Sequence, residues 1–309
     1  MAKIMVTGVN GFVGQHLAKE ISSEGHKVIG IGHNSELLAM DGGTVNEYFA
    51  CDLTKAYEVA NLPLDGIDAI INLAGLANVG DSFNNPDLYS RVNVAVLTSL
   101  CERLVRESRK TRMVAISTGA VYESDQPMPL TEDSRIINNG SPYALSKLLM
   151  EEAARKYRVE GLDCVIVRPF NHAGPGQRLG FLVPDLFKKI QTALNNKLPL
   201  RVGNLNTRRD YTDVRDVVRA YRQLALSRSL NHDIYNVCSG RSVAGTQILE
   251  LLLRELGDPS LEIEVDKTLM RPRDPEALYG SNHRLQTEIS WHPEITLDQT
   301  IKDFVAAAT

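Results

Sequence analysis

The sequence predicts an α/β protein with a doubly wound parallel sheet and a smaller C-terminal lobe. Three observations predict this fold. A turn with three evenly spaced glycines follows the first apolar run, strand-like and helical segments then alternate through the first half of the 309 residues, and the alternation stops after Arg168. Alternation of this kind is typical of a parallel sheet that is covered by helices on both faces.

The first element is a short strand, Lys3 to Thr7, followed by a turn with three glycines: Gly8, Gly11 and Gly14. A helical pattern then runs to Ile21. Glycines let a backbone approach a pyrophosphate closely, and the free N–H groups of the next helix point at the anion. The alternative is an ordinary tight turn, but the strand in front and the place at the start of the sequence favour a dinucleotide site in a Rossmann sheet.

Further strands are expected where apolar runs alternate with helical patterns, at residues 27–31, 47–52, 69–73, 112–117 and 163–168. In the run 69–73, apolar residues occur on both faces of the expected strand. This composition predicts a central strand that is covered on both faces.

After Arg168 a stretch rich in Gly and Pro reaches Gln177, and a helix at about 183–194 and a short strand near Leu200 follow. The strand-like run 233–237 is expected to return to the main sheet. We therefore predict a dinucleotide-binding domain over 1–170 that the chain re-enters at about 213–240. The substrate-binding lobe is expected to consist mainly of residues 171–212 and 241–309.

Composition narrows the class of protein. The formal net charge is −4 and the basic residues are scattered, so no nucleic-acid partner is expected. No segment approaches the roughly 20 apolar residues of a membrane span, and the early first strand leaves no room for a signal peptide. A cytoplasmic protein without a membrane partner is expected. Four cysteines, far apart and without a Cys-x-x-Cys pair, indicate buried free thiols and no metal site.

The segment Ser141 to Lys147 places Tyr143 and Lys147 four residues apart at the start of a predicted helix. At that spacing both side chains lie on one helix face, so the ammonium can lower the pKa of the phenol. A phenol supported in this way can exchange a proton with a carbonyl or an alcohol. A solvated surface pair is the alternative, and the glycine turn at the N-terminus favours the catalytic interpretation.

Five motifs occur in an order that resembles the extended short-chain dehydrogenase/reductases: the glycine turn, Asn72 to Gly75, Ser117 to Tyr122, the pair Tyr143 and Lys147, and Arg168 to Asn171. Within that family, the segments 168–177, 209–216 and 235–240 resemble the reductases of GDP-4-dehydro-6-deoxy-D-mannose. The resemblance covers nearly the whole chain. It implies an NAD(P)-dependent oxidoreductase that forms GDP-D-rhamnose, and a homodimer built through helices near 87–109 and 143–157. Those helix faces could instead pack on the sheet.

The predicted catalytic residues meet at the carboxyl ends of the strands, where doubly wound sheets bind their ligands. Thr118 follows the strand that ends at Ser117 and is expected to orient the substrate oxygen toward Tyr143. Its alternative role is to cap the strand end. The resemblance implies that Lys147 also binds the nicotinamide ribose. The complete set expected to contact the cofactor is Gly8, Asn10, Gly11, Phe12, Val13, Gly14, His33, Asn34, Asp52, Leu53, Leu73, Ala74, Gly75, Tyr143, Lys147 and Pro169.

Cofactor preference depends on the residues about 20 positions after the glycines, where an acid would bind the ribose of NAD. The chain has Gly32, His33, Asn34 and Ser35 there. Without an acid to repel a phosphate, NADP(H) is favoured and NAD(H) remains possible. Asp52 is expected either to contact adenine or to cap a following helix.

By resemblance, Arg209 and Arg271 bind the substrate diphosphate, because a guanidinium can bind two phosphate oxygens at once. Salt bridges to Asp210 or Asp274 are the alternative. Asn171 and Val183 complete the expected substrate contacts. His172 is assigned to packing or to a phosphate contact.

The residues after Thr118 are Gly119 and Ala120, where related dehydratases carry acids for the elimination of water. The sequence therefore excludes a dehydratase and leaves reduction of a C4 ketone, a 4-epimerase with tightly bound NAD, or a non-catalytic cofactor sensor or scaffold. Glu123 stands where the family usually has glycine, and the sequence gives it no role.

Overall fold

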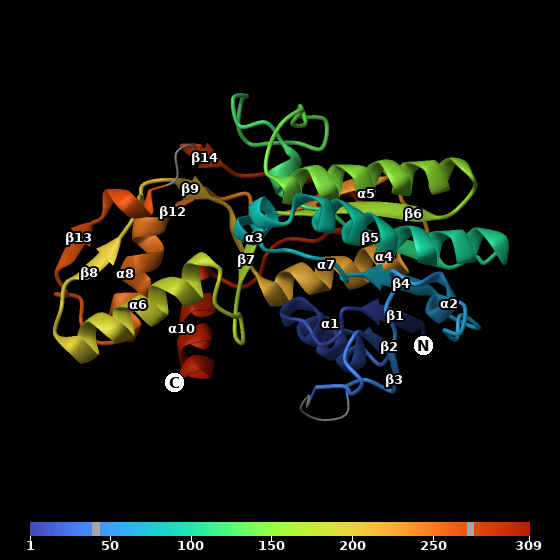
Figure 1. The fold of residues 1–309 in the computed structure, drawn as a ribbon, viewed down its shortest axis with the longest axis horizontal. Helices are drawn as coiled ribbons and strands as arrows, with labels where there is room; N and C mark the ends of the chain where they lie inside the picture. Colours follow the sequence, from blue (N-terminus) through green and yellow to red (C-terminus); the bar gives the residue numbers. More distant parts are fainter. Residues whose placement is uncertain (39–43, 271–274) are drawn as a thin grey trace.

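A computed structural model describes residues 1–38, 44–270 and 275–309. The largest sheet has seven parallel strands in the order β11-β6-β5-β4-β1-β2-β3 (Figure 1). Their bounds are β1 Lys3–Thr7, β2 Lys27–Gly32, β3 Glu47–Ala50, β4 Ala69–Asn72, β5 Arg112–Ile116, β6 Cys164–Pro169 and β11 Ile234–Val237. Every predicted strand is therefore confirmed, with ends that differ by one or two residues. β11 pairs in parallel with β6 at one edge of this sheet.

Helices cover both faces of this sheet, as the doubly wound prediction requires (Figure 1). One face packs against α1 (Phe12–Ser23) and α7 (Val214–Leu226), and the other packs against α4 (Pro86–Arg106) and α5 (Pro142–Val159). Side chains of a strand point alternately to the two faces. In β1, accordingly, Val6 belongs to the first core and Met5 to the second. Short helices α2 (Ala56–Val59) and α3 (Val79–Asn84) follow β3 and β4.

A third core forms the smaller lobe at the left of Figure 1. Its helices are α6 (Leu182–Asn196), α8 (Gly245–Glu255) and α10 (Leu297–Ala308). Its strands are β8 (Leu200–Val202), which pairs with β13 (Ile263–Val265), and β9 (Arg208–Arg209), which lies between β12 (Val243–Ala244) and β14 (Ala277–Leu278). The pair β7 (Asn171–Ala173) and β10 (Tyr211–Asp213) connects this lobe to the main sheet.

Near its C-terminal end, the chain packs once more against the core between the main sheet and helices α1 and α7. Helix α9 (His283–Ile289) carries Leu285 into that core, and the indole of Trp291 is buried beside it. The indole Nε1 donates to the carbonyl oxygen of Asp216 at 3.0 Å.

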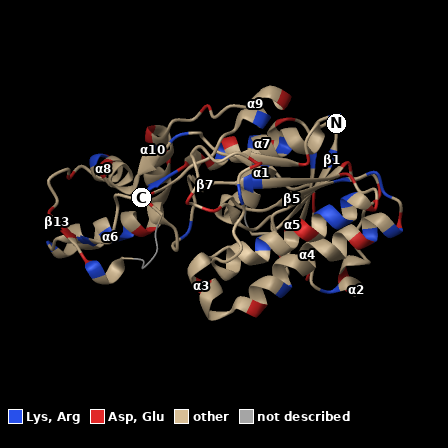
Figure 2. Ribbon diagram, turned by 90° about the horizontal axis from the view of Figure 1, so that it is seen from above, with Lys and Arg blue, Asp and Glu red and all other residues tan. Residues whose placement is uncertain are grey.

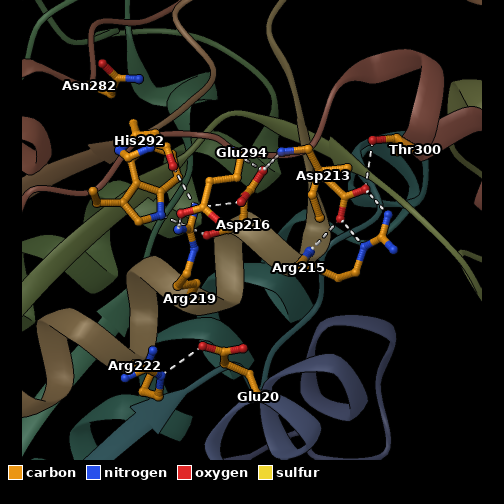
Figure 3. Close-up of polar contacts among 12 residues, drawn as sticks. Glu20, Asp213, Arg215, Asp216, Arg219, Arg222, Asn282, His292, Glu294 and Thr300 are labelled. Atoms are coloured by element: carbon orange, nitrogen blue, oxygen red, sulfur yellow. Dashed lines mark hydrogen bonds and ion pairs between the residues drawn. The ribbon is translucent and has the colours of Figure 1, made fainter. Parts of the chain in front are cut away.

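Two carboxylates at the start of α7 hold the segments around α10 (Figure 3). Asp213 caps α7 and accepts hydrogen bonds from Arg215 and from the Thr300 hydroxyl, the latter at 2.7 Å. Asp216 accepts from the backbone N–H groups of Glu294 and Ile295, at 3.0 and 2.9 Å. These bonds fix the C-terminal helix to the main domain.

Replacing Asp216 with alanine is expected to lower the free energy of unfolding by about 3 kcal/mol, because it leaves Arg219 and two backbone donors without their buried acceptor. Urea denaturation measures this change. The matched control is Asp133→Ala, which removes an exposed partner of Arg284 and should cost less than about 1 kcal/mol. Equal effects of the two substitutions would contradict the assignment.

Basic and acidic positions are interspersed along the helices of the ribbon in Figure 2. No helix among the described residues has the length and apolar character needed to cross a membrane. The four cysteines are buried and free.

Candidate active site

The glycine turn has the shape that a pyrophosphate requires. Gly8 has a φ of +67°, and a Cβ on Gly14 would lie 2.3 Å from the Gly8 carbonyl oxygen. Only glycine fits these two positions. Helix α1 begins directly after Gly11, whose lack of a side chain leaves the N-terminal N–H groups of the helix uncapped. The donor set and the close backbone approach therefore fit a dinucleotide.

The side chain of Asn10 connects this turn to the segment that follows β2. Its Nδ2 donates to the carbonyl oxygen of Glu36, and its Oδ1 accepts from the N–H of Leu38 at 3.0 Å. The segment includes His33 and Asn34, both exposed at the end of β2. Asn10 thus fixes the loop from which a ribose contact is expected.

At the ends of β1, β3 and β4, polar side chains form hydrogen bonds within the protein. The Thr7 hydroxyl donates to Asn72 at 2.7 Å and accepts from the N–H of Ala74 at 3.0 Å, which shapes the turn through Ala74. Asp52 accepts from both the N–H and the hydroxyl of Thr54, which closes a local turn before α2. The N-cap of α2 is Lys55 and no side chain caps the helix, so the expectation that Asp52 caps it is wrong. The side chain of Leu53 packs in the core.

Helix α5 brings Tyr143 to the carboxyl edge of the sheet. Ser141 caps the helix through the N–H of Ala144, and Pro142 starts its first turn. The phenol pKa is raised above its ordinary value, chiefly by burial, which corrects the expectation that Lys147 lowers it. A hydrogen bond with the Thr118 side chain opposes the increase in this pKa, and Tyr89 adds to it. Tyr143 is therefore protonated at neutral pH.

Thr118 has the capping role that was considered for it. Its hydroxyl accepts from the N–H of Ala120 at 3.2 Å, which caps the strand end. The same side chain contacts the phenol of Tyr143. The cap fixes the hydroxyl beside the proton donor.

Lys147 lies one helical turn beyond Tyr143 and is buried. Its Nζ donates to the carbonyl oxygen of Ile116 at 2.7 Å. Burial lowers the pKa of this ammonium from 10.5 to about 8, and the negative charge of Glu151 opposes that decrease. The amine is thus fixed at the end of β5 and poised to titrate near neutral pH.

The residues expected to bind substrate begin at β7. Asn171 is exposed at the start of β7, and the ring of His172 stacks on Phe12, with centroids 6.3 Å apart. Burial lowers the pKa of His172. Pro169 ends β6, and Val183 is buried in the lobe core.

One expected diphosphate ligand lies in the described part of the chain. The Nη1 of Arg209 donates to the carbonyl oxygens of Arg208 and Pro275, at 2.7 and 2.9 Å. The neighbouring Asp210 carboxylate accepts from Ser239 and Gly240. Arg271 lies outside the described residues.

Sequence reasoning missed Asn93, which is buried on α4. Its Oδ1 accepts from the N–H of Leu76 at 2.7 Å, and its Nδ2 donates to the Ser146 hydroxyl at 2.8 Å. That hydroxyl in turn donates to the carbonyl oxygen of Tyr143. Asn93 thus connects the turn after β4 to the catalytic helix. A lone amide in an otherwise apolar helical stripe was the available signal.

The structure also explains Glu123. Its carboxylate pairs with Arg135 at 2.9 Å, and its N–H donates to the Arg135 carbonyl oxygen. The residue fastens the long loop before α5.

Comparison with known proteins identifies the class. A model of the NAD-dependent epimerase/dehydratase family matches residues 4–238. The chain belongs to this family.

Individual members of the epimerase/dehydratase family resemble the chain along nearly its full length. GDP-6-deoxy-D-mannose reductase of Pseudomonas aeruginosa is 31% identical, over 97% of this chain and 95% of that protein. UDP-glucuronate 4-epimerase of Thermodesulfobacterium geofontis is 26% identical, over 98% of this chain and 94% of that protein. The solved structure of RMD from Pseudomonas aeruginosa complexed with NADPH has a TM-score of 0.84 at 28% identity, covering 99% of this chain and 98% of that one.

These relatives confirm the predicted superfamily and the Rossmann-type sheet. The chain is an NAD(P)-dependent oxidoreductase of a family that acts on nucleotide sugars. Among the described residues there is no cluster of His, Cys, Asp or Glu that could hold a metal ion.

Proposed function

We propose that this protein reduces the C4 keto group of a nucleotide-linked 4-keto-6-deoxyhexose, with GDP-4-dehydro-6-deoxy-D-mannose as substrate and GDP-D-rhamnose as product. The observation that carries the proposal is the position of Tyr143, whose phenol lies beside the Thr118 side chain at the start of α5. A protonated phenol is ready to donate, which is what ketone reduction needs first. The similarity to GDP-6-deoxy-D-mannose reductase supports the same substrate.

The roles of the chain's own residues follow from their positions. Thr118 holds the C4 oxygen by a hydrogen bond, and Tyr143 donates its proton to that oxygen as negative charge develops there. The ammonium of Lys147 stabilises the phenolate that remains. When bound, the nicotinamide supplies the hydride. Arg209 binds the diphosphate, away from the reacting carbon.

For the cofactor we propose NADP(H). The segment after β2 offers His33, Asn34 and Ser35, none of which would repel a 2′-phosphate. The Pseudomonas relative is complexed with NADPH. The glycine turn, with Gly8, Gly11 and Gly14, holds the pyrophosphate at the N-terminus of α1.

A 4-epimerase is the second candidate, because UDP-glucuronate 4-epimerase is also similar over 98% of this chain. Epimerisation begins with removal of a proton from a hydroxyl, so Tyr143 would have to start as phenolate.

The test is a panel of GDP-, UDP- and dTDP-linked 4-keto sugars, assayed with NADPH and with NADH for loss of reduced cofactor. Oxidation with the GDP sugar and NADPH is expected. Interconversion of UDP hexoses without net cofactor consumption, by a protein that retains NAD through purification, would establish the epimerase instead. Cofactor binding without turnover of any sugar would indicate the sensor or scaffold.

The rate of reduction is expected to fall as pH rises above about 8. Support for Tyr143 requires protonated Lys147, whose pKa of about 8 lies below the ordinary 10.5, so the ammonium is lost as pH rises through that value. Tyr143 stays protonated through this range because its pKa is raised. The pH profile of kcat/KM reports the pKa values of the essential groups in the free enzyme. A profile that stays flat up to the ordinary lysine pKa would contradict this role of Lys147.

We further propose a homodimer through α5. The inner side of the helix packs on the sheet through Met150 and Ala154, while Leu149 and Ile136 remain 45% and 39% exposed beside an apolar groove. Leu149→Arg is expected to convert dimers to monomers in light scattering, and Val159→Arg, beyond the groove, is the control. A monomeric wild-type protein would exclude this interface.

A further inference from the structure

Glu151 lies on α5 one turn beyond Lys147, and its side chain is completely buried. Its carboxylate accepts from the end of β5, from β6 and from α5 itself. The Ser117 hydroxyl donates at 2.6 Å, Arg168 donates from Nε and Nη2 at 2.8 and 2.6 Å, and Arg155 donates at 2.8 Å.

These partners adjoin the predicted catalytic residues. Ser117 comes directly before Thr118 at the end of β5, and Arg168 comes directly before Pro169 at the end of β6. Lys147, on the same helix, binds the carbonyl oxygen of Ile116. Lys147 and Glu151 therefore hold the consecutive residues Ile116 and Ser117 at the end of β5, and Glu151 also binds Arg168 of β6.

The charged side chains around Glu151 come from β6 and from α5 itself. Arg168 projects from β6 and lies over the ring of Tyr122, 4.8 Å from its centroid. Arg155 and Lys147 belong to α5 itself, and Arg155 is partly exposed. A buried ion pair is weak evidence for stability, because desolvation offsets the attraction. The position of Glu151, one helical turn from the ammonium of Lys147, indicates a function in the site.

We propose that Glu151 is a positioning residue, which keeps Lys147 charged and holds the ends of β5 and β6 against the catalytic turn of α5. This role rests on the proposed function only through Lys147, which both reduction and epimerisation require. The negative charge of Glu151 supports this positioning role, because the charge opposes the lowering of the Lys147 pKa by burial.

The test is a pH titration by NMR of the intact protein with ¹³C-labelled lysine side chains, with the Lys147 signal identified from a Lys147→Arg variant. The wild-type midpoint is expected near the pKa of about 8. Glu151→Gln should lower it by roughly one pH unit, the order of effect of a nearby opposite charge. Glu160→Gln, an exposed change at the end of α5, is the control and should leave the midpoint unchanged.

Glu151→Gln leaves Arg168 without its buried partner, so folding is checked by circular dichroism. If the variant fails to fold, the double variant Glu151→Gln/Arg168→Gln removes both charges and should still lower the Lys147 midpoint, but by less, because a positive charge is lost together with the negative one. An unshifted midpoint in the folded variant would overturn the proposal.

The titration needs no substrate, so its result is independent of the assays on nucleotide sugars. If a sugar is turned over, the alkaline limb of kcat/KM should move to lower pH in the same variant. An unmoved limb would overturn the role of Glu151 while leaving the proposed reaction intact.

Discussion

Replacing Tyr143 with phenylalanine is expected to lower kcat by about 10²- to 10⁴-fold, the contribution of a positioned proton donor. The phenol is half-buried, contacts Thr118 and has a raised pKa, and we propose it as the proton source at the strand edge. NADPH affinity should change little. Steady-state kinetics and calorimetry measure the two quantities separately.

Tyr89→Phe is the matched control. The ring of Tyr89 packs edge-on against Tyr143, with centroids 6.5 Å apart, and its hydroxyl donates to the carbonyl oxygen of Asn78. Loss of that hydroxyl should alter kcat only a few-fold, because it removes a single hydrogen bond. Near wild-type turnover by Tyr143→Phe would disprove its assignment as the proton donor.

Gly14→Ala is expected to weaken NADPH binding at least tenfold, equivalent to about 1.4 kcal/mol. The added Cβ would lie 2.3 Å from the Gly8 carbonyl oxygen and 2.7 Å from the Cα of Val9. Backbone atoms cannot rotate away as side chains can, so the turn must open. Calorimetric titration with NADPH measures the loss.

Gly25→Ala, at the far end of α1, is the control for general damage. Its added methyl would meet no atom within 4 Å, but the residue has a φ of +77°. This variant should lose about 1 kcal/mol of stability through backbone strain and bind NADPH normally. Normal binding by Gly14→Ala would refute the assignment of the glycine turn.

The main sheet could be predicted because its signals are local. Each central strand is an apolar run between helical segments, and each occurs in the structure within two residues of its expected place. Convergence of Thr118 with Tyr143 also follows from topology, because parallel strands end at one edge of the sheet.

Buried polar contacts could not be predicted in this way. In the sequence, Glu151 resembles any acid on an exposed helix face, and only the packing of α5 on β5 and β6 shows that it is buried against Arg168. Asp216 likewise looks like a surface acid, and its partners at residues 294 and 295 are distant in the chain. Such pairs depend on tertiary contacts that no periodic pattern reports.

The central claim is that Tyr143 and Lys147 support net reduction at C4 of a GDP-linked sugar. Incubation with NADPH deuterated at the transferable position and GDP-4-dehydro-6-deoxy-D-mannose tests it most directly. We expect one equivalent of NADPH to be oxidised for each product molecule, and NMR should find GDP-D-rhamnose with deuterium at C4. Unchanged NADPH, together with interconversion of UDP hexoses by the same preparation, would contradict the claim and establish an epimerase.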